Sequence, residues 1–297
     1  MNKDGIIIKG IGGFYYVEAA SQVYECKAKG IFRKEGKKPV AGDFVTISVN
    51  EGAENTIDVI KERTSELMRP PVANISRLFI IASTVEPAPV PFIIDKLTAI
   101  AASKNIEPIV VFTKCDMAPA DEFAGIYRRA GIKTFCVSNK TGEGIEAIKP
   151  ELEGHISAFA GNSGVGKSSL LNAIDPALGL KTAEISTKLG RGKHTTRHSE
   201  LFKMCGGYVA DTPGFASIVS EESEYIPTDI LAASFPEFED YLGQCRFSSC
   251  RHEKDKGCRI LEAVEAGDIS SSRHSSYVAL LQQAEAREEQ LKKSGKK

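Results

Sequence analysis

Hydrophobic and polar positions follow two different rhythms along this chain of 297 residues. Up to about residue 66, β-rich runs at 5–20, 22–32, 43–50 and 56–62 are separated by glycine, asparagine and proline positions. About five short strands in so few residues predict a small barrel, and we expect an OB-fold. The first predicted domain is therefore an OB-fold at residues 1–66.

From residue 67 the pattern changes to continuous apolar strands that alternate with helical stretches. We expect strands at 77–83, 108–116, 133–138 and 155–161, helices at 91–105, 121–131, 142–152 and 166–174, and a hairpin-like pair at 200–214. Such alternation predicts an α/β domain with a parallel sheet covered on both faces, which we place at 67–220. Residues 221–297 are predicted to be helical, with a Cys/His-rich insert and a charged amphipathic helix at 278–293.

The composition is ordinary for a globular protein, with 42% hydrophobic and 26% charged residues. No apolar run approaches the roughly 18 residues of a membrane span, and the first residues lack the apolar core of a signal peptide. We therefore expect a cytoplasmic protein with no membrane partner.

The charge is distributed unevenly although the formal net charge is only −1. Residues 27–38 carry six Lys/Arg against one Glu, and residues 181–197 carry five against one. Aromatic residues interleave with the first run, an arrangement that suits phosphate contacts and base stacking. Solvated loops and aromatic side chains in the barrel core are the alternative interpretation.

A complete phosphate-binding motif, GNSGVGKS, lies between an expected strand and an expected helix. With the next residue, the predicted nucleotide-binding positions are Gly161, Asn162, Ser163, Gly164, Val165, Gly166, Lys167, Ser168 and Ser169. Backbone N–H groups of such a loop face the β-phosphate. Lys167 would neutralise β- and γ-phosphate charge, and Ser168 would offer its hydroxyl to Mg²⁺.

Two further motifs are typical of a GTPase. DTPG begins at Asp211, 44 residues after Lys167, and is predicted to hold Mg²⁺ through a water and to sense the γ-phosphate through the Gly214 N–H. The segment GRGKHTTR at 190–197 stands where a GTPase keeps its first switch loop, and we expect a threonine there to complete the Mg²⁺ shell. The candidates are Thr195 and Thr196, with Thr196 preferred as the magnesium ligand.

The catalytic side chain is less clear from the motifs. Phe215 follows DTPG, where many signalling GTPases keep a glutamine that orients water. His194 in the predicted switch is the substitute that we expect to position the water. The alternative is that His194 only caps the loop or contacts RNA.

The guanine-reading element, TKCD at 113–116, comes before the phosphate loop rather than after it. Asp116 would accept hydrogen bonds from the guanine N1–H and exocyclic amine, and adenine lacks this donor pair. Thr113 would tether the loop, the Lys114 stem would pack over the base, and Ser138 ends a strand where the guanine O6-binding loop belongs. The order of the motifs therefore predicts a circularly permuted GTPase, cut after DTPG.

Three thiols and one imidazole lie within fourteen residues near the carboxyl end, at Cys245, Cys250, His252 and Cys258. This C-x₄-C-x-H-x₅-C spacing suits one tetrahedral, structural Zn²⁺ per chain. A disulfide with a spare thiol and chance clustering are the alternatives, and both fit a cytosolic chain poorly.

Together these motifs resemble those of the ribosome small-subunit-dependent GTPase A family (RsgA, also called YjeQ). The resemblance spans the OB-like start, the permuted motif order and the cysteine knuckle, with Thr113 where asparagine is commoner. It implies a GTPase that binds the small ribosomal subunit and its rRNA, hydrolyses GTP there and leaves with GDP. We also expect the protein to be a monomer. Two rival hypotheses are a nucleotide-gated RNA-binding module with incidental hydrolysis, and a GTPase that serves mRNA or a stress pathway.

Overall fold

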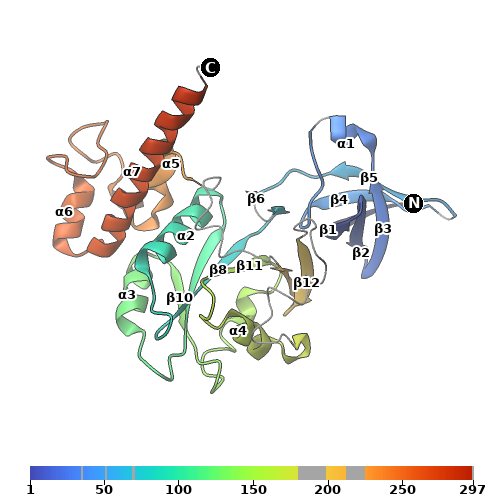
Figure 1. Cartoon of the computed structure of the whole chain (residues 1–297), viewed down its shortest axis with the longest axis horizontal. Coiled ribbons are helices and arrows are strands. Elements are labelled where there is room, and N and C mark those ends of the chain that lie inside the picture. Colours follow the sequence, from blue (N-terminus) through green and yellow to red (C-terminus); the bar gives the residue numbers. More distant parts are fainter. Residues whose placement is uncertain (35, 51, 69–70, 180–198, 212–224, 296–297) are drawn as a thin grey trace.

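The computed structural model describes residues 1–34, 36–50, 52–68, 71–179, 199–211 and 225–295. A barrel formed by the amino-terminal residues, a central α/β unit and a helical carboxyl-terminal unit lie in a row (Figure 1). In the described residues no helix is both long and apolar enough to cross a membrane.

The amino-terminal unit is a closed barrel of five strands, as predicted. The strands are β1 (Asn2–Ile11), β2 (Phe14–Ala19), β3 (Gln22–Ala28), β4 (Phe44–Ser48) and β5 (Asn55–Ile60), with the short helix α1 (Gly30–Lys34) after β3. They pair in the order β1-β2-β3-β5-β4, and β4 closes the barrel on β1. Alternate residues such as Ile7, Val17 and Ile47 are fully buried inside, because side chains alternate between the faces of a strand.

The central unit is a mixed sheet, and of its described strands β12 alone runs antiparallel to its neighbour β13 while the others are parallel. Its strands, in spatial order, are β10 (Lys133–Cys136), β9 (Glu107–Thr113), β8 (Arg77–Ser83), β11 (Ile156–Ala160), β13 (Gly207–Asp211) and β12 (Glu200–Met204). Leu78 and Ile80 of β8 pack with α2 (Pro91–Ser103) and α3 (Asp121–Arg129). Phe79 and Ile81 pack on the other face with α4 (Lys167–Ile174), so both faces are covered.

One predicted helix is wrong. Residues 142–152 form turns that end in a single 3₁₀ helix, η1 (Lys149–Glu151). Gly142 and Gly144 have φ of 82° and 76°, the left-handed region that an α-helix does not use. A Cβ at Gly144 would lie 2.4 Å from the Cys136 carbonyl oxygen, so this segment is a close-packed turn against β10.

The barrel and the central sheet are continuous. Lys9 of β1 pairs with Glu200 of β12, which joins all eleven strands into one sheet. A hairpin of β6 (Glu66–Met68) and β7 (Pro71–Ala73) forms a second connection between barrel and sheet, and the expected boundary at residue 66 falls on β6. Arg63 holds this connection to the barrel through the buried carboxylate of Asp43, with 2.7 Å between Nε and Oδ1.

The carboxyl-terminal unit comprises α5 (Thr228–Leu231), the 3₁₀ helices η5 (Ala232–Ser234) and η6 (Pro236–Tyr241), α6 (Arg259–Ala266) and α7 (Ser271–Ser294). The predicted helix at 278–293 is present and begins seven residues earlier, at Ser271. It lies along α2 of the central unit (Figure 1).

A buried charge network fastens α7 to α2. The fully buried Arg273 guanidinium contacts Asp95 at 3.0 Å, Thr98 at 2.9 Å and Glu237 at 2.6 Å. Burial raises the pKa of the Asp95 carboxyl, and the Arg273 charge acts in the opposite direction. In the described part of the chain, Arg273 is thus the cation that both carboxylates share.

Replacing Arg273 with alanine should destabilise the protein by about 3–5 kcal/mol, because two buried carboxylates lose their cation. Urea denaturation followed by circular dichroism measures this change. Lys292→Ala, an exposed position in the last turn of the same helix, is the matched control and should stay within about 0.5 kcal/mol of the wild type. Equal stability of the two variants would contradict the structural role of the network.

Candidate nucleotide site and metal centre

The phosphate loop connects β11 to α4 at the carboxyl edge of the parallel strands. Gly161, Gly164 and Gly166 have φ of 149°, 80° and 94°. A Cβ at Gly161 would lie 2.3 Å from the Ile81 carbonyl oxygen, so only glycine fits there. No side chain caps the first turn of α4, which leaves its N–H groups available to an anion.

Lys167 folds back over this loop. Its Nζ donates to the Gly161 carbonyl at 2.6 Å and to the Asn162 carbonyl at 2.7 Å. Burial lowers the pKa of the Lys167 ammonium, so its charged form gains from an anionic partner. Ser168 and Ser169 follow in the first turn of α4.

The predicted guanine-reading residues lie directly beside the phosphate loop. Thr113 ends β9 and donates its hydroxyl to the Val165 carbonyl at 2.5 Å. Lys114 adopts a left-handed φ of 62°, and its Nζ donates a hydrogen bond to the Gly164 carbonyl at 3.1 Å. The structure thus brings together segments that are about fifty residues apart in the sequence.

Asp116 and Ser138 meet at the outer end of this site. The Ser138 hydroxyl donates to Asp116 Oδ1 at 2.8 Å and accepts the Thr141 N–H at 3.1 Å. Ser138 is buried while Asp116 is exposed, so the serine orients a carboxylate that a base can reach. This arrangement provides the acceptor that guanine recognition requires.

Sequence reasoning missed two side chains that hold these loops. The Thr84 hydroxyl donates to the Lys114 carbonyl at 2.9 Å, and the Asn139 amide donates to the Gly166 carbonyl at 3.1 Å. Asn139 follows Ser138 directly, which is the only sequence signal that points to it. Its partner is 27 residues away, so no local pattern reveals the contact.

The residues predicted for Mg²⁺ binding, γ-phosphate sensing and the first switch are only partly described by the structure. Asp211 is the last residue of β13, beside the end of β11 that leads into the phosphate loop. His194, Thr195, Thr196 and Gly214 lie outside the described residues.

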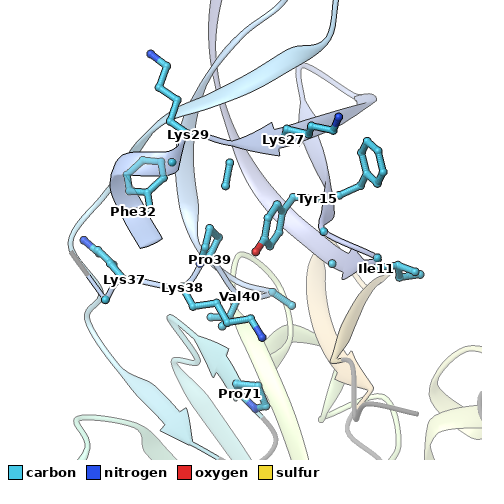
Figure 2. A pocket seen from close by; sticks show the side chains of 18 of the residues that line it. Ile11, Tyr15, Lys27, Lys29, Phe32, Lys37, Lys38, Pro39, Val40 and Pro71 are labelled. Carbon is cyan, nitrogen blue, oxygen red and sulfur yellow. The ribbon is translucent and has the colours of Figure 1, made fainter. Parts of the chain in front are cut away.

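The barrel carries a groove of about 980 Å³ between the β1–β2 hairpin and the segment from β3 to β4 (Figure 2). Five lysines line it, at Lys27, Lys29, Lys34, Lys37 and Lys38, together with Phe14, Tyr15 and Phe32. Ser199, at the start of the described segment that contains β12, also lines the groove. Tyr15, which is partly buried against the barrel core, points from the hairpin into this lysine-lined groove.

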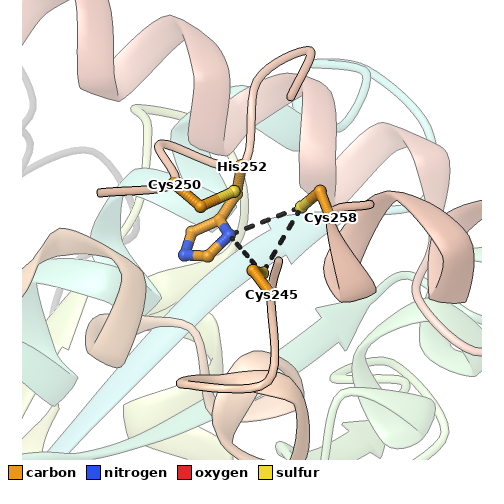
Figure 3. A group of neighbouring side chains, drawn as sticks. All are labelled: Cys245, Cys250, His252 and Cys258. Atoms are coloured by element: carbon orange, nitrogen blue, oxygen red, sulfur yellow. Dashed lines mark hydrogen bonds between the residues drawn. The ribbon is translucent and has the colours of Figure 1, made fainter. Parts of the chain in front are cut away.

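The distances among three ligand atoms of the cysteine and histidine cluster match the edges of a tetrahedral metal site, and the fourth ligand lies nearby (Figure 3). The His252 Nδ1 atom lies 3.5 Å from both Cys245 Sγ and Cys258 Sγ, which are 3.9 Å apart, and all four ligand atoms, including Cys250 Sγ, lie within 4.8 Å of one another. Zinc bonds of about 2.3 Å to sulfur and about 2.0 Å to nitrogen give tetrahedral edges of about 3.8 and 3.5 Å. A disulfide requires about 2.05 Å between sulfurs, so the spacing fits a metal and not a disulfide.

Neighbouring groups reinforce this fit. Burial raises the pKa of the Cys250 thiol to about 12, a penalty on the thiolate that a divalent cation offsets. From α7, His274 Nε2 contacts the His252 carbonyl at 2.7 Å and the Tyr277 hydroxyl donates to the Arg251 carbonyl at 2.9 Å. Helix α7 therefore supports the ligand loop from behind.

The permuted motif order, the parallel sheet and the joined guanine and phosphate loops define a circularly permuted GTPase. Two family models match, one described as RsgA GTPase over residues 60–220 and one described as RsgA N-terminal domain over residues 4–57. The chain belongs to the RsgA GTPase family.

Similar proteins cover almost the whole chain. The small ribosomal subunit biogenesis GTPase RsgA 2 of Oceanobacillus iheyensis is 42% identical over 96% of this chain and 98% of its own length. The RsgA of Ruminiclostridium cellulolyticum is 44% identical over 93% and 92%. Among solved structures, YloQ, a circularly permuted GTPase, superposes with a TM-score of 0.81 at 34% identity, covering 97% of this chain and 96% of its own. YjeQ from Thermotoga maritima superposes with 0.83 at 35% identity, covering 96% and 99%.

Proposed function

We propose that this GTPase binds the small ribosomal subunit and hydrolyses GTP to time a late step of subunit maturation. The observation that carries the proposal is the joined site, in which the guanine loops hydrogen-bond to the phosphate loop. The names of the relatives, small ribosomal subunit biogenesis GTPases, support the partner. Such a role places the protein in the cytoplasm, where we expect a monomer.

Each part of the chain has a task in this proposal. Residues 1–66 contact rRNA, residues 67–220 bind the nucleotide, and residues 221–297 hold the zinc knuckle. Asp116 reads the guanine, and Lys167 with the loop N–H groups binds the phosphates. Mg²⁺ would be held by the Ser168 hydroxyl and by Thr196, and it would neutralise phosphate charge when bound.

The zinc site has a structural task. Cys245, Cys250, His252 and Cys258 would fill all four positions of a tetrahedral ion, which leaves none for a substrate. Zn²⁺ supplies cross-linking of the ligand loop rather than chemistry on GTP. The loop then presents a fixed surface beside α7.

The lysine-lined barrel groove is the surface that we expect to contact rRNA. Reversing two of its charges, Lys37→Glu with Lys38→Glu, should weaken small-subunit binding at least tenfold and reduce its salt dependence, because phosphate contacts release counterions. Cosedimentation with small subunits at several salt concentrations measures both effects. Arg128→Glu with Arg129→Glu on α3 makes the same charge change elsewhere and is the control. Equal binding by the two double variants would remove the groove from the interface.

His194 remains the proposed positioning group for the attacking water. Changing His194 to alanine should lower kcat by about 10²-fold and leave GTP affinity within twofold, since the side chain would act on the water and not on the bound nucleotide. Single-turnover hydrolysis and fluorescent-GTP titration separate these effects. An unchanged kcat would exclude His194 from the reaction.

A further inference from the structure

Three consecutive carbonyl groups of the phosphate loop are each held by a side chain from a guanine loop. The bonds run from Lys114 to Gly164 at 3.1 Å, from Thr113 to Val165 at 2.5 Å and from Asn139 to Gly166 at 3.1 Å. The first two donors belong to the TKCD motif. The third comes from the separate loop that follows β10, where Asn139 stands directly after Ser138.

These bonds fix the direction of the neighbouring N–H groups. In a planar trans peptide, the carbonyl of one residue and the N–H of the next point in opposite directions. Holding the three carbonyls toward the guanine loops therefore directs the N–H groups of Val165, Gly166 and Lys167 to the opposite side. Those N–H groups belong to the cradle that a phosphate-binding loop offers to a β-phosphate.

The third bond reaches the residue at which the loop becomes helix α4. Gly166 has a φ of 94°, no side chain, and no side-chain cap at the start of α4. Its carbonyl also accepts the Leu170 N–H at 2.8 Å, the first hydrogen bond of the helix. The Asn139 amide thus ties the beginning of α4 to the guanine loop, at the peptide that carries the Lys167 N–H.

The contribution of the Asn139 side chain to the stability of the fold does not explain why an asparagine stands at this position. The other amide atom, Asn139 Oδ1, is buried and has no hydrogen-bond partner in the described part of the chain. An orphaned buried acceptor costs free energy, which roughly offsets the gain from one amide hydrogen bond. The Nδ2 bond is therefore roughly neutral for folding, and what it does in the structure is hold the Gly166 carbonyl of the phosphate loop.

We propose that Asn139 is a positioning residue for phosphate binding, acting through the Gly166–Lys167 peptide. Asn139 holds the Gly166 carbonyl, and Thr113 holds the neighbouring Val165 carbonyl through its hydroxyl. Asn139 then affects the β-phosphate more than the base, although it lies in the loop next to the guanine-orienting Ser138. This inference rests on the nucleotide site described above.

The test compares two adjacent residues that are expected to affect different parts of the bound nucleotide. Affinities for GMP, GDP and inosine diphosphate are measured by competition against a fluorescent GDP analogue. Inosine lacks the exocyclic amine that Asp116 would read. Asn139→Ala should weaken GDP binding about five- to tenfold, the value of one lost hydrogen bond. It should leave GMP affinity within about twofold and the ratio of GDP to inosine diphosphate affinity unchanged.

Ser138→Ala is the matched variant, because its hydroxyl contacts Asp116 and not the phosphate loop. It should weaken GMP and GDP by the same factor and lower the discrimination against inosine diphosphate. The melting temperature of nucleotide-free Asn139→Ala should lie within about 2 °C of the wild type, because the orphaned acceptor is removed with the bond. Should Asn139→Ala fail to fold, Asn139→Ser, whose hydroxyl is too short to reach the carbonyl, tests the same bond.

Unchanged GDP affinity in a folded Asn139 variant would overturn the inference, and so would an equal loss for GMP and GDP. Neither result affects the assignment of the nucleotide site. A wild-type protein that binds none of the three nucleotides would instead contradict the proposed function.

Discussion

Replacing Lys167 with alanine should weaken GTP and GDP binding by about 10²–10³-fold and abolish measurable hydrolysis. The Lys167 ammonium lies over the phosphate loop and donates two hydrogen bonds to its carbonyls. On nucleotide binding these donors can turn to β- and γ-phosphate oxygens, and each charge-assisted bond contributes about 1.5–3 kcal/mol. Calorimetric titration with GDP and steady-state hydrolysis measure the two losses.

Lys149→Ala supplies the control for that experiment. Lys149 lies in η1 and pairs with Glu146, so its removal takes away one positive charge outside the nucleotide loops. Its affinity for GDP should stay within about twofold of the wild type. If Lys167→Ala bound GDP as tightly as the wild type does, the nucleotide would have to bind elsewhere in the protein.

Replacing Cys258 with serine should release the bound metal and unfold the ligand loop. The Cys258 thiol is buried and lies 3.5 Å from His252 Nδ1 inside the cluster. Structural zinc contributes about 10–16 kcal/mol to the folding of small zinc sites, so the loss of one ligand has a large effect. Atomic absorption should find zinc falling from one per chain to a small fraction, and the melting temperature should fall by several degrees.

Cys205→Ser is the matched control, because Cys205 is a free cysteine in the turn between β12 and β13. It should retain one zinc per chain and a melting temperature close to that of the wild type. Full zinc content together with an unchanged melting curve in Cys258→Ser would refute the metal assignment.

The features that the sequence predicts well are local in the chain. The glycines of the phosphate loop and the spacing of the cysteine cluster each lie within fewer than twenty residues, so their chemistry is visible in one segment. The strands at 77–83 and 155–161 are almost fully buried, and their continuous apolar runs show it. The permutation follows from the order of the motifs alone.

The features that escaped prediction join distant segments. Arg273 and Asp95 are separated by 178 residues, and nothing near either residue identifies the other. The pairing of Lys9 with Glu200, which makes barrel and sheet continuous, has the same origin. The expected helix at 142–152 was wrong for a different reason, because the left-handed glycines at its start outweigh the apolar spacing that follows.

The central claim is that the small ribosomal subunit is the partner that activates this GTPase. GTP hydrolysis by the purified protein, alone and with purified small or large ribosomal subunits, tests it most directly. We predict a slow intrinsic rate, because Phe215 stands where a glutamine commonly orients water, and a large stimulation by small subunits only. The same slow rate under all three conditions would contradict the account and would favour a nucleotide-gated RNA-binding module whose hydrolysis is incidental.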